Sequence, residues 1–282
     1  MDTPQIADEV LAAPAEHLFL SPHYDDIALS AGATVRRLAN LGRKPETLIV
    51  FGSEPNTRVE LSPFASQVHQ GWGLDSTEVI ARRRTEEDNA SRAIGATVRL
   101  LPFHDAIYRG HNYLSDDDLF GDPAAAEANL PVEIVASLRL PATPTDDVRV
   151  YAPLGIGSHV DHQLVFNAAA SLADAGWEVW LYEDIPYALR DGALERRLKQ
   201  IEGASRVHPH GRIEAATAWD AKLDGILSYP SQLNTIFRHY VGVEPSREGI
   251  RRALNSYASE SDEVNIGERF WVLSDAPIHE GS

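Results

Sequence analysis

Short apolar runs alternate with segments of helical periodicity through the first 185 residues of the chain. The runs are typical of buried strands and cover residues 17–21, 46–53, 97–103, 147–153 and 178–184. The segments with apolar residues at helical spacing cover residues 27–42, 76–95, 131–140 and 160–176. Strands that alternate with helices predict right-handed βαβ units. We therefore expect an α/β fold of three layers, Rossmann-like, with helices on both faces of a mostly parallel sheet.

The chain of 282 residues contains no linker-like stretch. We expect a single domain over residues 1–282, with an α/β core at about 17–185 and a C-terminal elaboration at about 186–282. Beyond residue 190 the pattern is mainly helical, and residues 269–274 are a further candidate strand. A polar stretch up to about residue 75 is predicted to be a loop, and 104–129 a loop with some helix.

Composition excludes several classes of function. The chain has no cysteine, which removes disulfides, thiolate metal sites and a cysteine nucleophile, and which fits a reducing cytosol. The net charge of −17 argues against binding to nucleic acid or to an anionic membrane. No signal peptide is recognisable, and no apolar stretch approaches the ~18 residues that cross a bilayer. We expect a soluble, cytoplasmic protein.

Two adjacent aspartates follow the first predicted strand, in the stretch FLSPHYDD. His23 and Asp26 are three residues apart, so a turn between strand and helix can point both at one spot. Imidazole and carboxylate suit zinc and similar divalent metals. Helix capping is the alternative, because an aspartate at a helix start accepts backbone N–H bonds. Capping explains either Asp25 or Asp26, but neither the second acid nor His23.

A second polar turn, GIGSHVDH, follows the fourth predicted strand and enters a helix. His159 and His162 are spaced i, i+3 and so share a helix face, with Asp161 between them. The carboxyl ends of parallel strands meet at one edge of a sheet, where ligands bind. The spacing and the position therefore favour a functional site over packing.

A third turn, FHDAIYR, follows the third predicted strand. Asp105 could bind a polar substrate or pair with Arg109. The first two turns supply two histidines and one aspartate as candidate metal ligands, with an acid and a histidine left over. A hydrolytic zinc site requires such a set, since three protein ligands leave a position for water and further groups serve as base and acid.

These motifs resemble those of a known enzyme family. SPHYDD and GSHVDH are similar to the P-H-x-D-D and H-x-D-H motifs of the LmbE-like (PIG-L-like) zinc N-acetyl-sugar deacetylases. RRRTEEDNASRAIGA resembles the R-x-x-E helix of the family, and FHDAIYR its substrate-contacting loop. The resemblance covers most of residues 17–185 and implies a Rossmann-like fold with one zinc ion per chain.

The resemblance also implies roles for particular residues. His23, Asp26 and His162 would bind zinc, and Asp25 would be the general base. His159 would polarise the amide carbonyl, stabilise the oxyanion and protonate the departing amine.

Further roles concern orientation and the substrate. Asp161 would orient His159 and raise its pKa. The residues expected to contact the substrate are Arg83, Asp105, Tyr24 and Trp72. Some sugar-thiol deacetylases of the family carry a tyrosine where this chain has Gly157, a departure that leaves the substrate open.

The resemblance implies a zinc-dependent hydrolase that removes an N-acyl group, in particular acetyl, from an amino sugar or a glucosamine-containing conjugate. One alternative is a metal-dependent hydrolase of another bond, such as a phosphoester, although two-metal phosphoesterases need more bridging acids. Another is a sugar-binding protein without turnover. Dinucleotide binding is disfavoured because no G-x-G-x-x-G follows the first strand.

Overall fold

A computed structural model describes residues 3–54, 61–71, 79–201, 207–259 and 266–273 of the chain. Its sheet has seven strands in the order β3-β2-β1-β4-β5-β7-β6. The strands are β1 (Glu16–Ser21), β2 (Glu46–Ile49), β3 (Thr97–Leu100), β4 (Val148–Pro153), β5 (Glu178–Tyr182), β6 (Val207–Glu214) and β7 (Gly267–Leu273). The first five are parallel, whereas β7 runs antiparallel to β5, and β6 antiparallel to β7. The predicted mostly parallel sheet is confirmed.

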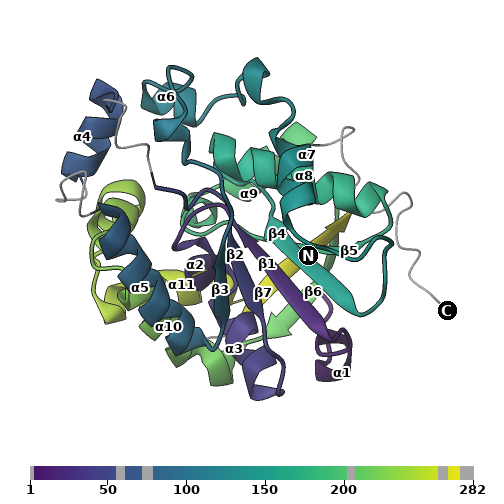
Figure 1. The fold of residues 1–282 in the computed structure, drawn as a ribbon. Coiled ribbons are helices and arrows are strands. Elements are labelled where there is room, and N and C mark those ends of the chain that lie inside the picture. The colour runs from purple at the N-terminus through teal and green to yellow at the C-terminus, as the bar shows by residue number, and fades with distance from the viewer. Residues whose placement is uncertain (1–2, 55–60, 72–78, 202–206, 260–265, 274–282) are drawn as a thin grey trace.

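Helices cover both faces of the sheet, as the three-layer prediction requires. In Figure 1, α7 and α8 lie on one side, and α3, α5 and α10 on the other. The main helices are α2 (Asp26–Ser30), α3 (Gly32–Asn40), α4 (Pro63–Gly71), α5 (Val79–Ile94), α7 (Leu130–Ser137), α8 (Val160–Asp174), α9 (Ala193–Ile201), α10 (Trp219–Leu227) and α11 (Arg247–Ala258). The remaining helices are α1 (Asp8–Leu11), α6 (Asp116–Leu119), η1 (Ala106–Tyr108), η2 (Ala125–Glu127), η3 (Tyr187–Leu189), η4 (Ala216–Ala218) and η5 (Asn234–Val241). No helix in the described ranges is long and apolar enough to cross a membrane.

Alternate strand residues build two different cores. Small and aliphatic side chains face α7 and α8, whereas a row of aromatic rings faces α3. The aliphatic set includes Leu18, Leu20, Val150, Ala152, Val179 and Leu181, and the aromatic set Phe19, Tyr151, Trp180, Tyr182 and Phe270. The rings of Phe19 and Tyr151 stack with centroids 4.0 Å apart. This period of two fixes the register of the strands, because a slip of one residue would exchange the two sets.

Three expectations from the sequence differ from the structure. The helix predicted over 27–42 is two helices, α2 and α3, which are separated at Ala31. The predicted loop up to about residue 75 contains α4. The mainly helical C-terminal region supplies two strands, and β6 was missed because its sequence VHPHGRIE has no apolar run. Pro209 fits there because β6 is an edge strand, and the register shifts between Pro209 and Gly211.

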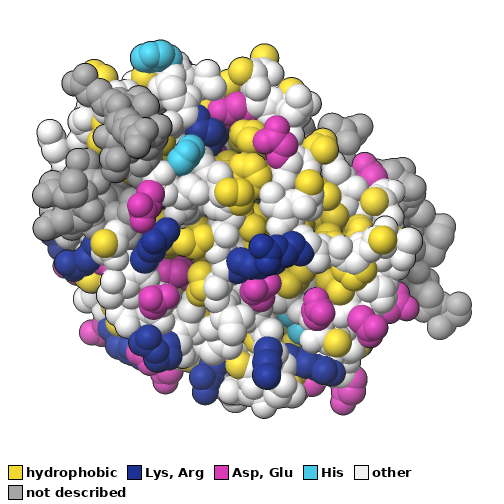
Figure 2. All heavy atoms as spheres, in the orientation of Figure 1, with side chains coloured by type: hydrophobic (Ala, Val, Ile, Leu, Met, Phe, Trp, Pro, Cys, Tyr) yellow, Lys and Arg dark blue, Asp and Glu magenta, His cyan; other side chains and the backbone are white. Residues whose placement is uncertain are grey.

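Charged side chains are mixed on the face of the molecule that Figure 2 shows. Acidic and basic groups are interspersed there rather than segregated. The net charge of −17 is therefore not gathered into one acidic patch on this face.

A buried ion pair joins Glu268 of β7 to Lys222 of α10 and gives a first prediction. The Glu268 carboxylate accepts hydrogen bonds from Lys222 Nζ (2.6 Å), from the Thr34 hydroxyl (2.6 Å) and from the backbone N–H groups of Ala33 and Thr34. Glu268→Ala leaves the buried Lys222 charge without its carboxylate, so we expect the free energy of unfolding to fall by about 3–5 kcal/mol. Urea denaturation measures this, with the exposed Glu248→Ala as control; equal effects in the two variants would contradict the prediction.

Candidate active site

The carboxyl ends of β1 and β4 lie side by side where the strand order reverses. β1 pairs with β2 on one side and with β4 on the other, which makes this the switch point of the sheet. The loop after β1 carries His23 and leads into α2, and the loop after β4 carries His159 and leads into α8. The structure brings His23, Asp26 and His162 together, with one ligand atom of each within 4.8 Å of the others.

His162 has the environment of a metal ligand. Its Nδ1 lies 2.6 Å from Oδ1 of Asp184, whereas its buried Nε2 has no hydrogen-bond partner and lies 3.4 Å from Oδ1 of Asp26. Burial lowers the pKa of His162, but Asp26 and Asp184 outweigh it and raise the pKa to about 10. A buried nitrogen left unpaired beside a carboxylate, on a ring oriented by a second carboxylate, fits a divalent cation. Two imidazoles and one carboxylate are a donor set that suits zinc.

His23 is oriented in the same manner from the other side. Its Nδ1 lies 3.6 Å from Oδ2 of Asp26, and its Nε2 lies 2.9 Å from Oδ2 of Asp161. Asp161 is itself held by Arg109, whose Nη1 lies 2.7 Å from Oδ1, and by the backbone N–H of Ala106. Asp161 therefore orients His23. Its carboxylate oxygens face these partners, whereas Asp161 contacts His159 through its backbone N–H.

His159 is a neutral hydrogen-bond donor. Its Nδ1 accepts the backbone N–H of Asp161 at 3.2 Å, so in the neutral ring the proton sits on Nε2. Burial and the neighbouring His23 place the pKa of His159 well below its usual value, although the negative charge of Asp161 acts in the opposite direction. Asp161 therefore acts on the pKa of His159 in the predicted direction, but burial and His23 outweigh it. A neutral N–H suits stabilisation of an oxyanion better than protonation of an amine.

Asp25 lies beside the group of candidate metal ligands but outside it. It is the N-cap residue of α2, yet its side chain makes no capping hydrogen bond. One carboxylate oxygen lies 3.5 Å from Nη2 of Arg83. Burial raises the pKa of Asp25, the Arg83 guanidinium opposes that shift, and the adjacent Asp26 carboxylate adds to it. A buried carboxylate with a raised pKa next to a metal cluster fits a general base.

A cavity of about 520 Å³ opens over these groups. Its walls are largely apolar and include Leu119, Phe120, Tyr187, Ile236 and Tyr240. Asp105, Asp116, Gln232 and His239 add polar groups. At Gly157, where φ is +88°, a Cβ atom would lie 2.5 Å from Cγ of Tyr187. The aromatic ring of Tyr187 therefore occupies the space that a side chain at position 157 would need.

The residues predicted to contact the substrate differ in where they lie relative to this cavity. Arg83 and Asp105 line the cavity. Asp105 caps η1 through the N–H of Ile107, while Arg109 pairs with Glu127 and Asp161, so the Asp105–Arg109 pair is not formed. Tyr24 is 3 % exposed, donates its hydroxyl to the carbonyl of Gly52, and is not one of the described residues that line the cavity. Trp72 lies outside the described residues.

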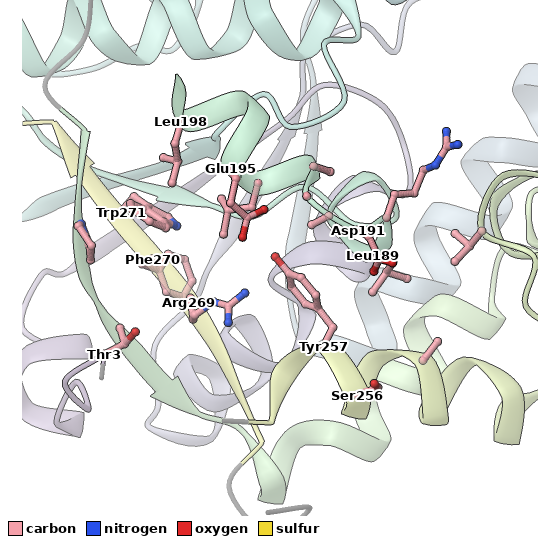
Figure 3. Close-up of a pocket in the computed structure, with 18 of the residues that line it drawn as sticks. Thr3, Leu189, Asp191, Glu195, Leu198, Ser256, Tyr257, Arg269, Phe270 and Trp271 are labelled. Carbon is pink, nitrogen blue, oxygen red and sulfur yellow. The ribbon is translucent and has the colours of Figure 1, made fainter. Parts of the chain in front are cut away.

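A second cavity, of about 610 Å³, lies between α9, α11 and β7 (Figure 3). Tyr257 and Arg269 project into it, and both donate to the buried carboxylate of Glu183. Within the described part of the chain, both groups of residues that could hold a metal include His23, which lines the first cavity together with Asp26 and His159. None of the described residues that line the larger cavity belongs to either of these groups of candidate metal ligands.

Asp184 was not recognised as a partner of His162, and it gives a second prediction. Asp184→Asn removes the negative charge that orients and polarises His162, so we expect zinc affinity to fall about 10- to 100-fold. Competition with a chromogenic chelator measures this affinity. Asp191→Asn, at an exposed position in the second cavity, is the control. Equal zinc affinity in the parent and in Asp184→Asn would contradict the assignment.

Comparisons with known proteins point in the same direction as the geometry. Residues 18–173 match the model of a family described as PIG-L, GlcNAc-PI de-N-acetylase. A 2'-N-acetylparomamine deacetylase of Niallia circulans is 27% identical over 278 residues, covering 93% of this chain and 96% of the relative. A 2'-N-acetylparomamine deacetylase of Streptomyces fradiae is 30% identical over 229 residues, covering 76% and 72%.

Among solved structures, a deacetylase of the teicoplanin biosynthesis pathway superposes with a TM-score of 0.73 at 23% identity. The match covers 93% of this chain and all of that chain. At this level of identity the similarity shows a shared fold. His23, Asp25, Asp26, His159, Asp161 and His162 lie within the residues that the family model matches, whereas Asp184 lies beyond them.

Proposed function

The chain belongs to the PIG-L family of GlcNAc-PI de-N-acetylases, and on this premise we propose that it is a zinc-dependent hydrolase that removes acetyl from an N-acetylglucosaminyl unit of a sugar conjugate. Its relatives are deacetylases of N-acetylated sugars, which identifies the chain as an enzyme of that kind. The observation that carries the zinc proposal is the buried Nε2 of His162, unpaired and facing Asp26, with Asp25 alongside but outside the cluster.

The side chains divide the work of amide hydrolysis among them. His23, Asp26 and His162 would hold the zinc ion, which would supply Lewis-acid chemistry that lowers the pKa of water and polarises a carbonyl. Asp25 accepts the proton of the attacking water. The Nε2–H of His159 donates to the carbonyl oxygen as that oxygen becomes negative. The carbon–nitrogen bond then breaks as Asp25 gives that proton to the departing nitrogen, and acetate and a free amine result.

The charge of the cavity favours a neutral or cationic conjugate. Arg83 is the one Lys or Arg among the described lining residues, and its guanidinium faces Asp25. Asp105 and Asp116 add carboxylates outside the metal cluster. A phosphate group on the substrate would meet these acids with little compensation, whereas an ammonium group would be stabilised. We propose a cationic N-acetylated amino sugar of the kind for which the paromamine relatives are named.

The partners of Asp161 argue against the alternative function of phosphoester hydrolysis. Its carboxylate faces His23 and Arg109, so Asp26 is the carboxylate left for a metal in the His23, Asp26 and His162 cluster. A two-metal phosphoesterase centre needs further bridging acids. The geometry therefore supports a single metal and amide hydrolysis.

Acetate release from 2'-N-acetylparomamine, N-acetylglucosamine and GlcNAc-phosphatidylinositol tests the proposal. We expect release that stops after treatment with a chelator, returns with zinc, and is fastest with the paromamine derivative. Release that persists in metal-free protein would exclude the zinc mechanism. Preference for the phosphatidylinositol conjugate would exclude the cationic substrate.

A further inference from the structure

Tyr24, the residue between His23 and Asp25, has its main-chain carbonyl fixed by a contact with the side chain of Tyr229. Tyr229 follows α10, is 1% exposed, and places its hydroxyl oxygen 2.6 Å from the main-chain oxygen of Tyr24. The side chain of Tyr24 is fixed as well, through its hydrogen bond to Gly52. The position of Asp25 in the cavity therefore depends on the contact between Tyr229 and the Tyr24 carbonyl.

The same hydroxyl meets a second oxygen. The hydroxyl oxygen of Tyr229 also lies 2.6 Å from Oε2 of Glu87, which is buried on α5. A phenol has one proton and can donate it to only one of two acceptors. Both short contacts are favourable only if the proton between Glu87 and Tyr229 belongs to Glu87. The other carboxyl oxygen, Oε1, accepts from the hydroxyl of Ser91 at 2.7 Å, so it needs no proton.

We propose that Glu87 is a positioning residue that acts as a neutral carboxylic acid. It donates its proton to Tyr229, and the Tyr229 hydroxyl can then donate to the carbonyl of Tyr24 and hold the loop that carries Asp25. When Glu87 loses that proton, the Tyr229 hydroxyl turns to the carboxylate, and the Tyr24 carbonyl loses its partner. The effect on turnover rests on the proposed function, because that function makes Asp25 the base.

The surroundings of Glu87 agree with a neutral form. Burial raises the pKa of Glu87 to about 8, and the negative charge of Asp25 acts in the same direction. The hydrogen bonds of Tyr229 and Ser91 and the charge of Arg83 oppose this shift. The titratable and charged groups that face it are Asp25 and Tyr24 from the β1–α2 loop, Tyr229 from the segment after α10, and Arg83 of its own helix. The positive charge of Arg83 is thus shared between Glu87 and Asp25, since Nη2 of Arg83 lies 3.5 Å from Oδ1 of Asp25.

Glu86, the residue before Glu87, has hydrogen-bond partners of a different kind. Glu86 is also buried, but it accepts from the backbone N–H and the hydroxyl of Ser231 and from Arg82. Each of these partners brings its own proton, so the geometry requires none on Glu86. The difference between the two acids is therefore one of proton count, since their burial is the same.

Glu87→Gln is the direct test, because an amide keeps a donor toward Tyr229 and an acceptor toward Ser91. In the parent we expect kcat/KM to fall above a pH of about 8, as Glu87 ionises. In Glu87→Gln we expect activity at pH 7 to stay within about threefold of the parent and this alkaline fall to disappear or move to higher pH. The exposed Asp88→Asn on the same helix is the control and should keep the parent profile.

Stability gives a readout that does not depend on deacetylation. The folded-state pKa is about 8 and the ordinary value is 4.5, so between these values the folded protein holds a proton that the unfolded chain lacks. Stability of the parent then falls as pH rises through this window, by up to about tenfold in the folding constant per pH unit, and Glu87→Gln lacks this part of the fall. Metal-free protein can be used, so this result stands if the assumed substrate is wrong.

Two results would overturn the proposal. One is an alkaline limb of kcat/KM that stays at the same pH in Glu87→Gln. The other is a stability curve of Glu87→Gln that falls between pH 5 and 8 as steeply as that of the parent. Tyr229→Phe provides a second variant, which should show a lowered kcat across the whole range because the Tyr24 carbonyl has lost its donor at every pH. A Tyr229→Phe protein with the parent's kcat would contradict the role of this contact.

Discussion

Replacing Asp25 with asparagine is expected to lower kcat by about 10²- to 10⁴-fold while the protein keeps its metal. An amide of the same shape cannot accept the proton of the attacking water. Metal binding should survive, because Asp25 belongs to neither of the two clusters of potential ligands in the described residues. KM should change little, since the proton transfer takes place on the way to the transition state.

The measurement pairs steady-state kinetics with zinc content and a denaturation curve. The denaturation curve is needed because the variant leaves the buried Arg83 with a weaker partner, so a loss of folding must be separated from a loss of chemistry. Asp117→Asn, an exposed acid on α6, is the control. A kcat within a few-fold of the parent, with normal zinc content, would mean that another group is the base.

The sequence predicted the parts of the fold and site that local patterns encode. Apolar runs located the five parallel strands, and polar residues directly after the first and fourth strands located the candidate site. The rule that ligands bind at the carboxyl ends of parallel strands then brought these two turns together, and the resemblance to the family singled out His23, Asp26 and His162 as ligands. The three-residue spacings within the two turns were enough to locate the site, because the turns follow β1 and β4, which are neighbours in the sheet.

The sequence could not predict the partners that orient these ligands. Asp184 follows β5 as an acid without a recognisable pattern, and only the fold brings it to His162, 22 positions earlier. Arg109 lies four residues from Asp105, which favoured a local pair, yet it binds Glu127 and Asp161. Asp161 lies two residues after His159, but the helix start directs its carboxylate across the site to His23. Each of these contacts is set by loop geometry between distant segments.

The two histidines of the second motif, His159 and His162, should differ in whether their replacement by alanine removes the zinc ion. Two overlapping clusters could hold a metal, His23 with Asp26 and His162, or His23 with His159 and Asp161. In the second, Asp161 already faces Arg109, Ala106 and His23, and Nδ1 of His159 accepts a backbone N–H. In the first, Nε2 of His162 is buried without a partner. The ligand set is therefore expected to be the first.

His162→Ala should accordingly lose zinc affinity by more than the roughly 10- to 100-fold expected for an outer-sphere partner, and lose activity with it. His159→Ala should keep its zinc and lose about 10²- to 10³-fold in kcat, the usual cost of one oxyanion donor. Zinc content after dialysis against a defined zinc buffer, measured with kcat on the same samples, separates the two. If His159→Ala loses its metal while His162→Ala retains it, the second cluster is the metal site, and Asp26 is left to act as the base beside it.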